Sequence, residues 1–226
     1  MDTQADLVIP PLPKDAGSAA PQTKPEPVAK KPSFEIAARD PRPLARFPRS
    51  EDVVKEEISQ LAHQNGSAPA PERVHQIGDA YSELGDHRQA AKVYEGITTQ
   101  FPTYTAIDEV RYYLGVEYEL AGDFRNARKA YYDLIVKNPA SKLIPCAYFA
   151  FGEMFFAEAK DDPSKNDLAQ QAYMEVLKYQ ATPLAPDALM RLAQTYARKG
   201  DDAKALATWT RLKRDYPNSE AATKAP

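Results

Sequence analysis

Three histidines and a group of aspartates are the side chains of this 226-residue chain that could ligate a metal or transfer protons: His63, His75, His87, Asp161, Asp162 and Asp167. His75 and Asp79 lie four positions apart, so on a helix they would share one face and could hold a metal ion. No third ligand accompanies them in the sequence, so a solvated pair is the preferred interpretation. The aspartates lack the glycine and the terminal glutamate of a calcium-binding loop. We therefore expect no metal or other cofactor.

The single cysteine, Cys146, is the other reactive side chain. It follows Pro145 at an expected helix start among apolar residues, and no histidine is paired with it in the sequence. A small buried side chain is therefore a better interpretation than a nucleophile. The phosphate-binding glycine loop and the G-x-S-x-G and H-E-x-x-H motifs are absent from the sequence. The sequence thus predicts that the chain is not an enzyme.

The chain instead repeats one pattern: a small residue, an aromatic three positions later, Gly-Asp, alanine, a second aromatic and proline. The small residue recurs in steps of 37, 37 and 41 residues, at Gly78, Gly115, Gly152 and Ala193. A period of this length indicates a repeat architecture. We expect four repeats, over residues 71–104, 108–141, 145–183 and 186–219.

Each repeat should form two antiparallel helices, named here helix A and helix B. In the first repeat, helix A is expected from Pro71 to Leu84, with apolar residues at helical spacing. Gly85 suits the left-handed position after helix A, and Asp86 can cap helix B. Pro102 ends the repeat because proline cannot continue a helix.

The small residue of helix A is expected to face the alanine of helix B where the two helices cross closely, with aromatics on either side. A larger side chain there would cost roughly 1–3 kcal/mol through overpacking. Each hairpin buries its apolar faces only by stacking on its neighbours, which predicts an all-α fold. The expected packing residues are Gly78, Tyr81, Ala90, Gly115, Tyr118, Ala127, Gly152, Phe155, Ala169, Ala193, Tyr196, Ala205 and Trp209.

Three segments depart from the repeat. Residues 159–167 are polar and five residues longer than the Gly-Asp turn, which predicts a longer exposed loop within the third repeat. Residues 1–50 hold half of the 20 prolines and predict a disordered, extended tether. Within residues 51–70, apolar side chains predict a helix near 51–63 that caps the first repeat.

The C-terminal end of the array is expected to be open. The tail, residues 220–226, is too short for a full capping helix, and terminal repeats normally need one. Ala205, Leu206 and Leu212 would then form an apolar edge. That edge could form a homo-oligomer, contact another domain or be covered by the tail.

Charge and hydropathy limit the partners. Residues 1–50 carry 8 Lys/Arg and 6 Asp/Glu, a net +2, and the remainder carries 21 and 26, a net −5. Neither part carries the strong net positive charge that would support nucleic-acid binding. No apolar run is long enough for a transmembrane helix, and no signal peptide is visible at Met1-Asp2-Thr3-Gln4. A cytoplasmic start and a chain whose signal has been removed both fit.

Counted from Pro71, the pattern has a small residue at position 8, an aromatic at 11, Gly at 15, Ala at 20, an aromatic at 24 and Pro at 32. This pattern resembles the tetratricopeptide repeat (TPR), over about residues 71–217. The resemblance implies a right-handed α-solenoid. The endings Tyr216-Pro217-Asn218-Ser219 and Asn138-Pro139-Ala140-Ser141 are similar to those of bacterial envelope TPR proteins, such as BamD-like lipoproteins and the C-terminal domain of the Tol–Pal coordinating protein. The lipobox cysteine and coiled-coil heptads of those families are absent. This narrower resemblance implies a periplasmic or outer-membrane-associated scaffold.

The TPR resemblance also implies an inner groove, lined by helix A, that binds proteins or peptides. The first copy would contribute His75, Gln76 and Asp79, and the later copies Tyr112, Tyr113, Val116, Glu119, Phe149, Glu153, Phe156, Met190, Arg191 and Gln194. These types favour an extended or helical peptide with apolar anchors, and not the acidic C-terminal peptide of a carboxylate clamp. Core packing remains an alternative for Tyr112 and Phe149. A recruiting subunit of an enzyme and a self-associating structural protein remain alternative functions.

Overall fold

The computed structural model describes residues 50–63, 70–179 and 182–226, and all regular secondary structure in these ranges is helical. The predicted tether lies outside them, apart from Ser50. The helices are α2 (Glu51–His63), α3 (Pro71–Glu83), α4 (His87–Gln100), α5 (Ile107–Leu120), α6 (Phe124–Lys137), α7 (Ile144–Glu158), α8 (Lys165–Val176), α9 (Ala185–Arg198), α10 (Asp202–Asp215) and α11 (Glu220–Thr223).

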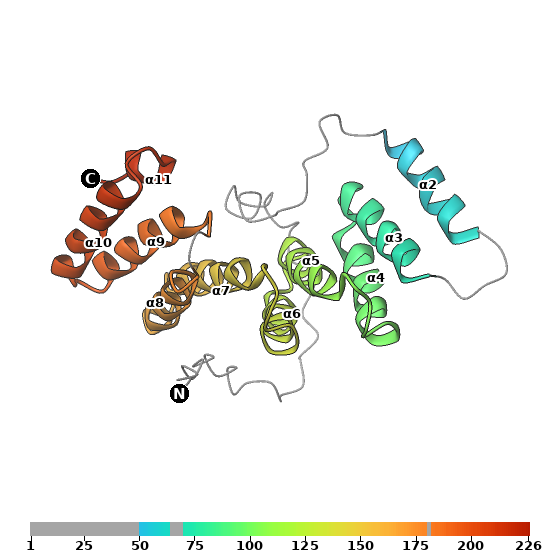
Figure 1. Ribbon diagram of the computed structural model, residues 1–226, viewed down its shortest axis with the longest axis horizontal. Helices are drawn as coiled ribbons and strands as arrows, with labels where there is room; N and C mark the ends of the chain where they lie inside the picture. Colours follow the sequence, from blue (N-terminus) through green and yellow to red (C-terminus); the bar gives the residue numbers. More distant parts are fainter. Residues whose placement is uncertain (1–49, 64–69, 180–181) are drawn as a thin grey trace.

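Four antiparallel hairpins, α3–α4, α5–α6, α7–α8 and α9–α10, stack in chain order between α2 at one end and α11 at the other (Figure 1). A continuous core joins the first three hairpins and reaches α9, because each helix A packs on helix B of the preceding repeat. Five fully buried tyrosines are its largest side chains: Tyr94, Tyr112, Tyr131, Tyr148 and Tyr173. The predicted all-α solenoid is confirmed.

The short turns have the predicted geometry. Gly85, Gly122 and Gly200 take φ values of 75°, 79° and 76°, the left-handed region that glycine adopts without a Cβ clash. Each following aspartate caps helix B; the Asp86 side chain, for example, accepts a hydrogen bond from the backbone N–H of Gln89. The sequence pattern therefore determines the hairpin turns directly.

The loop of the third repeat is shorter than predicted. It covers residues 159–164, since Lys165, Asn166 and Asp167 form the first turn of α8. The Asp162 side chain accepts hydrogen bonds from the backbone N–H and the hydroxyl of Ser164, and these bonds turn the chain into the helix. Asn166 is buried, so part of the polar insert belongs to the packed hairpin.

A tyrosine ring, and not the predicted alanine, is nearest to each helix-A glycine. A Cβ atom on Gly78, Gly115 or Gly152 would lie 2.5, 2.4 and 2.4 Å from a ring carbon of the tyrosine on helix B of the same repeat. The helix-B alanines Ala90, Ala127 and Ala169 are fully buried as expected. Glycine is needed in helix A because the ring lies directly against its backbone. The rings concerned are those of Tyr94, Tyr131 and Tyr173.

Both ends of the array are covered to some extent. At the first, α2 packs on α3 and buries Val54. At the other, α11 packs on α9 and α10, and Leu212 packs with Ala221 and Ala222 of α11, which agrees with the alternative that the tail covers the edge. Ala205 is buried too, so the expected exposure is wrong for both residues. Ser219 caps this four-residue helix, because its hydroxyl oxygen accepts a hydrogen bond from the backbone N–H of Ala222. Leu206 remains 68% exposed.

Candidate functional site

Side chains of the third and fourth repeats, all but one of them on helix A, form one cluster, here called the Arg–Phe cluster: Glu153, Phe156, Arg191, Gln194 and Arg198, with Tyr173 of helix B. At its centre, the Phe156 ring of α7 contacts two guanidinium groups of α9. The guanidinium carbon of Arg191 lies 5.2 Å from the ring centroid, and that of Arg198 lies 3.4 Å from it. Both separations are within the range of cation–π contact. The two repeats therefore present a joint aromatic and cationic surface.

Glu153 fixes one of these arginines. Its Oε2 accepts a hydrogen bond from Nη2 of Arg191 at 2.8 Å, and its Oε1 accepts one from the Tyr173 hydroxyl at 2.6 Å. Nη1 of Arg191 donates to Oε1 of Gln194 at 3.2 Å. Both side chains of the ion pair are largely buried, with 15% and 11% exposure. Arg191 is thus held in place between two helices.

Arg198 completes the cluster from the last turn of α9. Its Nη1 donates to the backbone carbonyl of Phe156 at 2.7 Å, while the residue stays exposed. Desolvation and the positive charge of Arg191 lower the pKa of Arg198, although Tyr173 and Glu153 raise it. The sequence analysis did not place Arg198 in the groove. Its role depends on how α9 crosses α7, and no spacing within one repeat reveals that crossing.

Each glycine repeat also links its helix-B tyrosine to a helix-A carboxylate. The hydroxyls of Tyr94, Tyr131 and Tyr173 donate to Asp79, Glu119 and Glu153 at 2.6, 2.7 and 2.6 Å. The tyrosine ring passes the glycine and reaches the face expected to bind a partner. The sequence analysis missed this contribution of helix B. An acidic residue recurs one or four positions after the glycine, and this recurrence could have predicted the bond to the tyrosine.

Other predicted groove residues have different surroundings. Tyr112, Val116 and Phe149 are 0%, 1% and 4% exposed and belong to the core, which agrees with the packing alternative for the two aromatics. Tyr113 is 8% exposed. Met190 packs in a separate cluster near the C-terminus, with Leu189, Leu212, Ala221 and Ala222.

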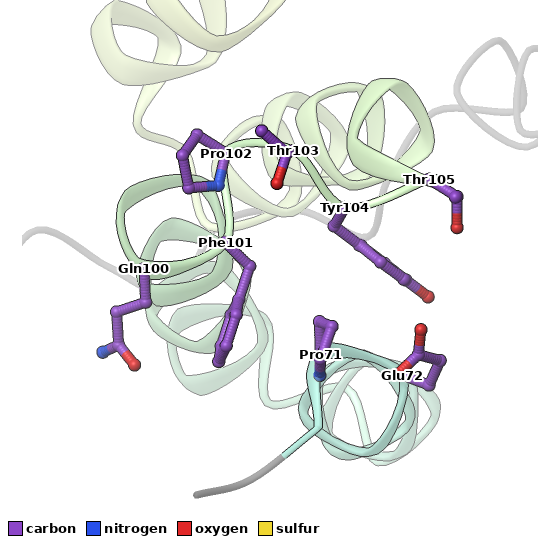
Figure 2. A pocket seen from close by; sticks show the side chains of 8 residues that line it. All are labelled: Pro71, Glu72, Gln100, Phe101, Pro102, Thr103, Tyr104 and Thr105. Atoms are coloured by element: carbon purple, nitrogen blue, oxygen red, sulfur yellow. The ribbon is translucent and has the colours of Figure 1, made fainter.

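A shallow pocket of about 320 Å³ lies where the first repeat meets the second (Figure 2). Figure 2 shows the side chains of Phe101 and Tyr104 on two sides of it, with Pro71 between them and Glu72 on the side of Tyr104. Burial and the negative charge of Glu72 raise the pKa of Tyr104, so its phenol stays neutral and can donate or accept a hydrogen bond. The pocket could hold a small apolar side chain beside an acidic rim.

Two of the three histidines lie beside polar side chains, and the side chain of His63 is outside the described residues. His75 is buried, with its Nδ1 3.3 Å from the Tyr104 hydroxyl and its Nε2 3.7 Å from Asp79, so the solvated-pair interpretation is wrong for it. Nδ1 of His87 lies 2.7 Å from Oε2 of the buried Glu117. Within the described residues, no three His, Cys, Asp or Glu side chains are grouped to hold a metal ion. Cys146 is half-buried beside the core.

The fold and this face define an α-solenoid of helix hairpins with an ordered side-chain surface on its helices A. Residues 75–142 match one tetratricopeptide repeat family model, and residues 187–219 match another. These matches assign both segments to the tetratricopeptide repeat. The third repeat lies between the matched segments and carries the longer loop. No curated protein matches the chain.

Several solved structures share the fold. The C-terminal part of a TPR repeat-containing protein from Cytophaga hutchinsonii gives a TM-score of 0.59 at 18% identity, over 74% of this chain and 60% of that one. BtubC from P. vanneervenii gives 0.56 at 17% identity, over 73% and 70%. MamA MSR-1 gives 0.54 at 18% identity, over 74% and 90%. At these identities the likeness shows the fold alone.

None of the helices in the described ranges combines the length and the apolar character needed to cross a bilayer.

Proposed function

We propose that this protein is a protein–protein interaction scaffold that binds a peptide segment of its partner on the face formed by helices α3, α5, α7 and α9. The TPR fold suggests such a scaffold. The observation that carries the peptide-binding proposal is the Arg–Phe cluster, in which predicted groove residues from two repeats meet. A partner would gain contacts from both repeats at once.

Preorganisation supports this function. Glu153, Arg191 and Tyr173 fix one another through the hydrogen bonds described above. The guanidinium groups of Arg191 and Arg198 both lie over the Phe156 ring. Because these side chains are already ordered, binding loses little side-chain entropy, which otherwise costs about 0.5–1.5 kcal/mol for each immobilised flexible side chain. Aromatic and arginine residues are also the types that dominate binding energies at protein interfaces.

Selection from a phage-displayed library of 12-residue peptides tests the proposal on the full chain. We expect recurring sequences with apolar anchors, and their synthetic versions should bind in a fluorescence-anisotropy titration. In NMR spectra of the labelled full chain, their addition should shift the amide signals of α7 and α9. A selection that yields no recurring sequence would contradict the proposal.

A matched pair of variants locates the binding face. Gln194→Trp adds a large ring to the half-buried edge of the Arg–Phe cluster, whereas Met174→Trp adds the same ring to α8, where Met174 is 44% exposed. The first variant should weaken binding of the selected peptides, and the second should leave it unchanged. Equal binding by both variants would exclude this face as the site.

We also propose that the partner belongs to a bacterial cell-envelope complex. The Tyr-Pro-x-Ser type ending of the repeats supports this assignment. Fractionation of source cells, followed by detection of the untagged chain with an antibody, tests it. We expect the chain in the periplasmic or outer-membrane fraction, and an exclusively cytoplasmic chain would contradict the assignment.

A further inference from the structure

We propose that Arg198, stacked on Phe156, binds an aspartate or glutamate side chain of the partner peptide, next to an apolar peptide residue. This inference rests on the proposed function and specifies the chemistry of its ligand. It names a residue outside the groove positions inferred from the TPR pattern. It also differs from a C-terminal carboxylate clamp, because the ligand is a side chain within the peptide.

The hydrogen-bonding capacity of Arg198 is largely unused. A guanidinium group carries five N–H donors in a planar fork. In the described part of the chain, Arg198 makes one hydrogen bond, from Nη1 to the carbonyl of Phe156. That bond, and the 3.4 Å distance from the guanidinium carbon to the Phe156 ring centroid, show that the group is held over the ring. The remaining donors fit the two oxygens of a carboxylate, which arginine binds in a bidentate manner.

The charges around Arg198 also favour an anionic ligand. Arg191 and Arg198 share one nearby carboxylate, Glu153, and both oxygens of that carboxylate already accept hydrogen bonds. Lys199, the next residue, is paired with Asp167, which leaves Arg198 without that aspartate. The Arg–Phe cluster thus carries an excess of one positive charge. A partner carboxylate would neutralise that charge at a partly desolvated position, where charge pairing is stronger than in bulk water.

The position of Arg198 beside the Phe156 ring indicates which residue should neighbour the acidic residue of the peptide. The Phe156 side chain is 8% exposed, and the guanidinium groups of Arg191 and Arg198 lie over its ring. A peptide carboxylate bound by Arg198 therefore lies close to an apolar surface. The adjacent peptide residue is expected to be apolar, which gives the recognised segment an acidic residue next to an anchor.

Parallel selections on the full-length wild type and on Arg198→Glu test the inference. The library is displayed so that each peptide has no free C-terminal carboxylate, which restricts acidic ligands to side chains. We expect wild-type selections enriched in Asp or Glu beside an apolar residue, and Arg198→Glu selections enriched in Lys or Arg at the same peptide position. Arg88→Glu, which reverses an exposed arginine on α4, is the control and should select the wild-type sequences.

Titrations with synthetic peptides make the test quantitative. Arg198→Gln should weaken binding of the best wild-type peptide at least about 10-fold, the loss expected for a hydrogen-bonded charge pair. A peptide with its acidic residue changed to Gln should bind wild type and Arg198→Gln equally. Circular dichroism of each variant checks that the helices are intact.

The outcomes separate this inference from the proposed function. If wild type and Arg198→Glu select the same peptides, the acidic ligand is wrong while the peptide-binding face stands. If Arg198→Lys binds the acidic peptide as tightly as wild type, the bidentate arrangement is wrong. A wild-type selection without any recurring sequence would remove the proposed function and this inference together.

Discussion

The first three repeats and the fourth use different residues at the point where helix A crosses helix B. In the first three, a glycine lies against a fully buried tyrosine, whose hydroxyl reaches a helix-A carboxylate. The fourth repeat has Ala193 and Trp209 at these positions, and Trp209 is partly exposed beside α11. It has Gln194 where the third repeat has Glu153.

This difference shows how hydrogen bonding changes toward the end of the array. In the first three repeats, the helix-B tyrosine donates a hydrogen bond to the helix-A carboxylate of the same repeat. In the fourth repeat tryptophan has no hydroxyl, and Arg191 instead pairs with Glu153 of the preceding repeat. The last hairpin is joined to its neighbour by an ion pair, as Arg128 of α6 and Glu158 of α7 join the second and third hairpins, and the Arg–Phe cluster lies at the last of these junctions.

Removing the helix-B aromatic should give the largest contrast. Tyr131→Ala leaves a cavity in the continuous core, and it should lower the free energy of unfolding by about 3–5 kcal/mol. Trp209→Ala should cost less, because Trp209 is partly exposed and water can fill its place. Urea unfolding followed by circular dichroism measures both. Equal losses would mean that the fourth repeat is as tightly packed as the second.

Exchanging the small residues of helix A tests the same crossing of helices A and B, with a smaller expected loss of stability. Gly115→Ala places a Cβ 2.4 Å from the Tyr131 ring, and it should destabilise the fold by roughly 1–3 kcal/mol despite the higher helix propensity of alanine. Ala193→Gly should cost about 1–2 kcal/mol, from the lower helix propensity of glycine and the loss of one buried methyl group, with no clash. The same urea titrations give both values.

A double variant identifies the cause of the Gly115→Ala loss. Adding Tyr131→Leu removes the ring that the new methyl group would meet. The two substitutions should then cost less together than the sum of their separate effects. Strict additivity would show that the clash with the ring is not the source.

The sequence predicted the hairpins well because short-range chemistry determines them. Gly85 and Asp86 specify the turn through a left-handed backbone and a side-chain cap, and both are local properties. The partner of Gly115 was predicted less well. The pattern shows that helix A needs a small residue, but only packing in three dimensions shows that the Tyr131 ring is nearest to it.

The candidate site was harder to predict than the fold. Four groove residues inferred from the TPR pattern, Glu153, Phe156, Arg191 and Gln194, lie together. Arg198 was not among the predicted residues. Its contact with Phe156 depends on the angle between helices of two repeats, and sequence spacing within one repeat carries no information on that angle.

Removing a hydroxyl should have a smaller effect that depends on burial. Tyr131→Phe removes the hydrogen bond that Tyr131 donates to the buried Glu119, and the substitution should cost about 1–2 kcal/mol. Tyr94→Phe removes the hydrogen bond that Tyr94 donates to Asp79, whose side chain is 50% exposed. Because water can replace the hydroxyl there, this substitution should cost less than about 1 kcal/mol. Thermal unfolding of both variants measures the order, and a reversed order would contradict this account.

The smallest effect concerns pH at the start of the fourth repeat. Burial raises the pKa of Asp187 in the first turn of α9, so the folded protein ionises this carboxyl less readily than the unfolded chain does. Its contribution to stability is therefore favourable below its ordinary pKa of about 4, and it is lost as pH rises through the raised value. Asp187→Asn should increase the urea midpoint at pH 7 and leave it unchanged in acid. In the second repeat, Asp108 of α5 accepts a hydrogen bond from Ser141, so Asp108→Asn should not increase the midpoint at pH 7. A midpoint that rises equally in both variants would show that burial of Asp187 does not distinguish the last repeat.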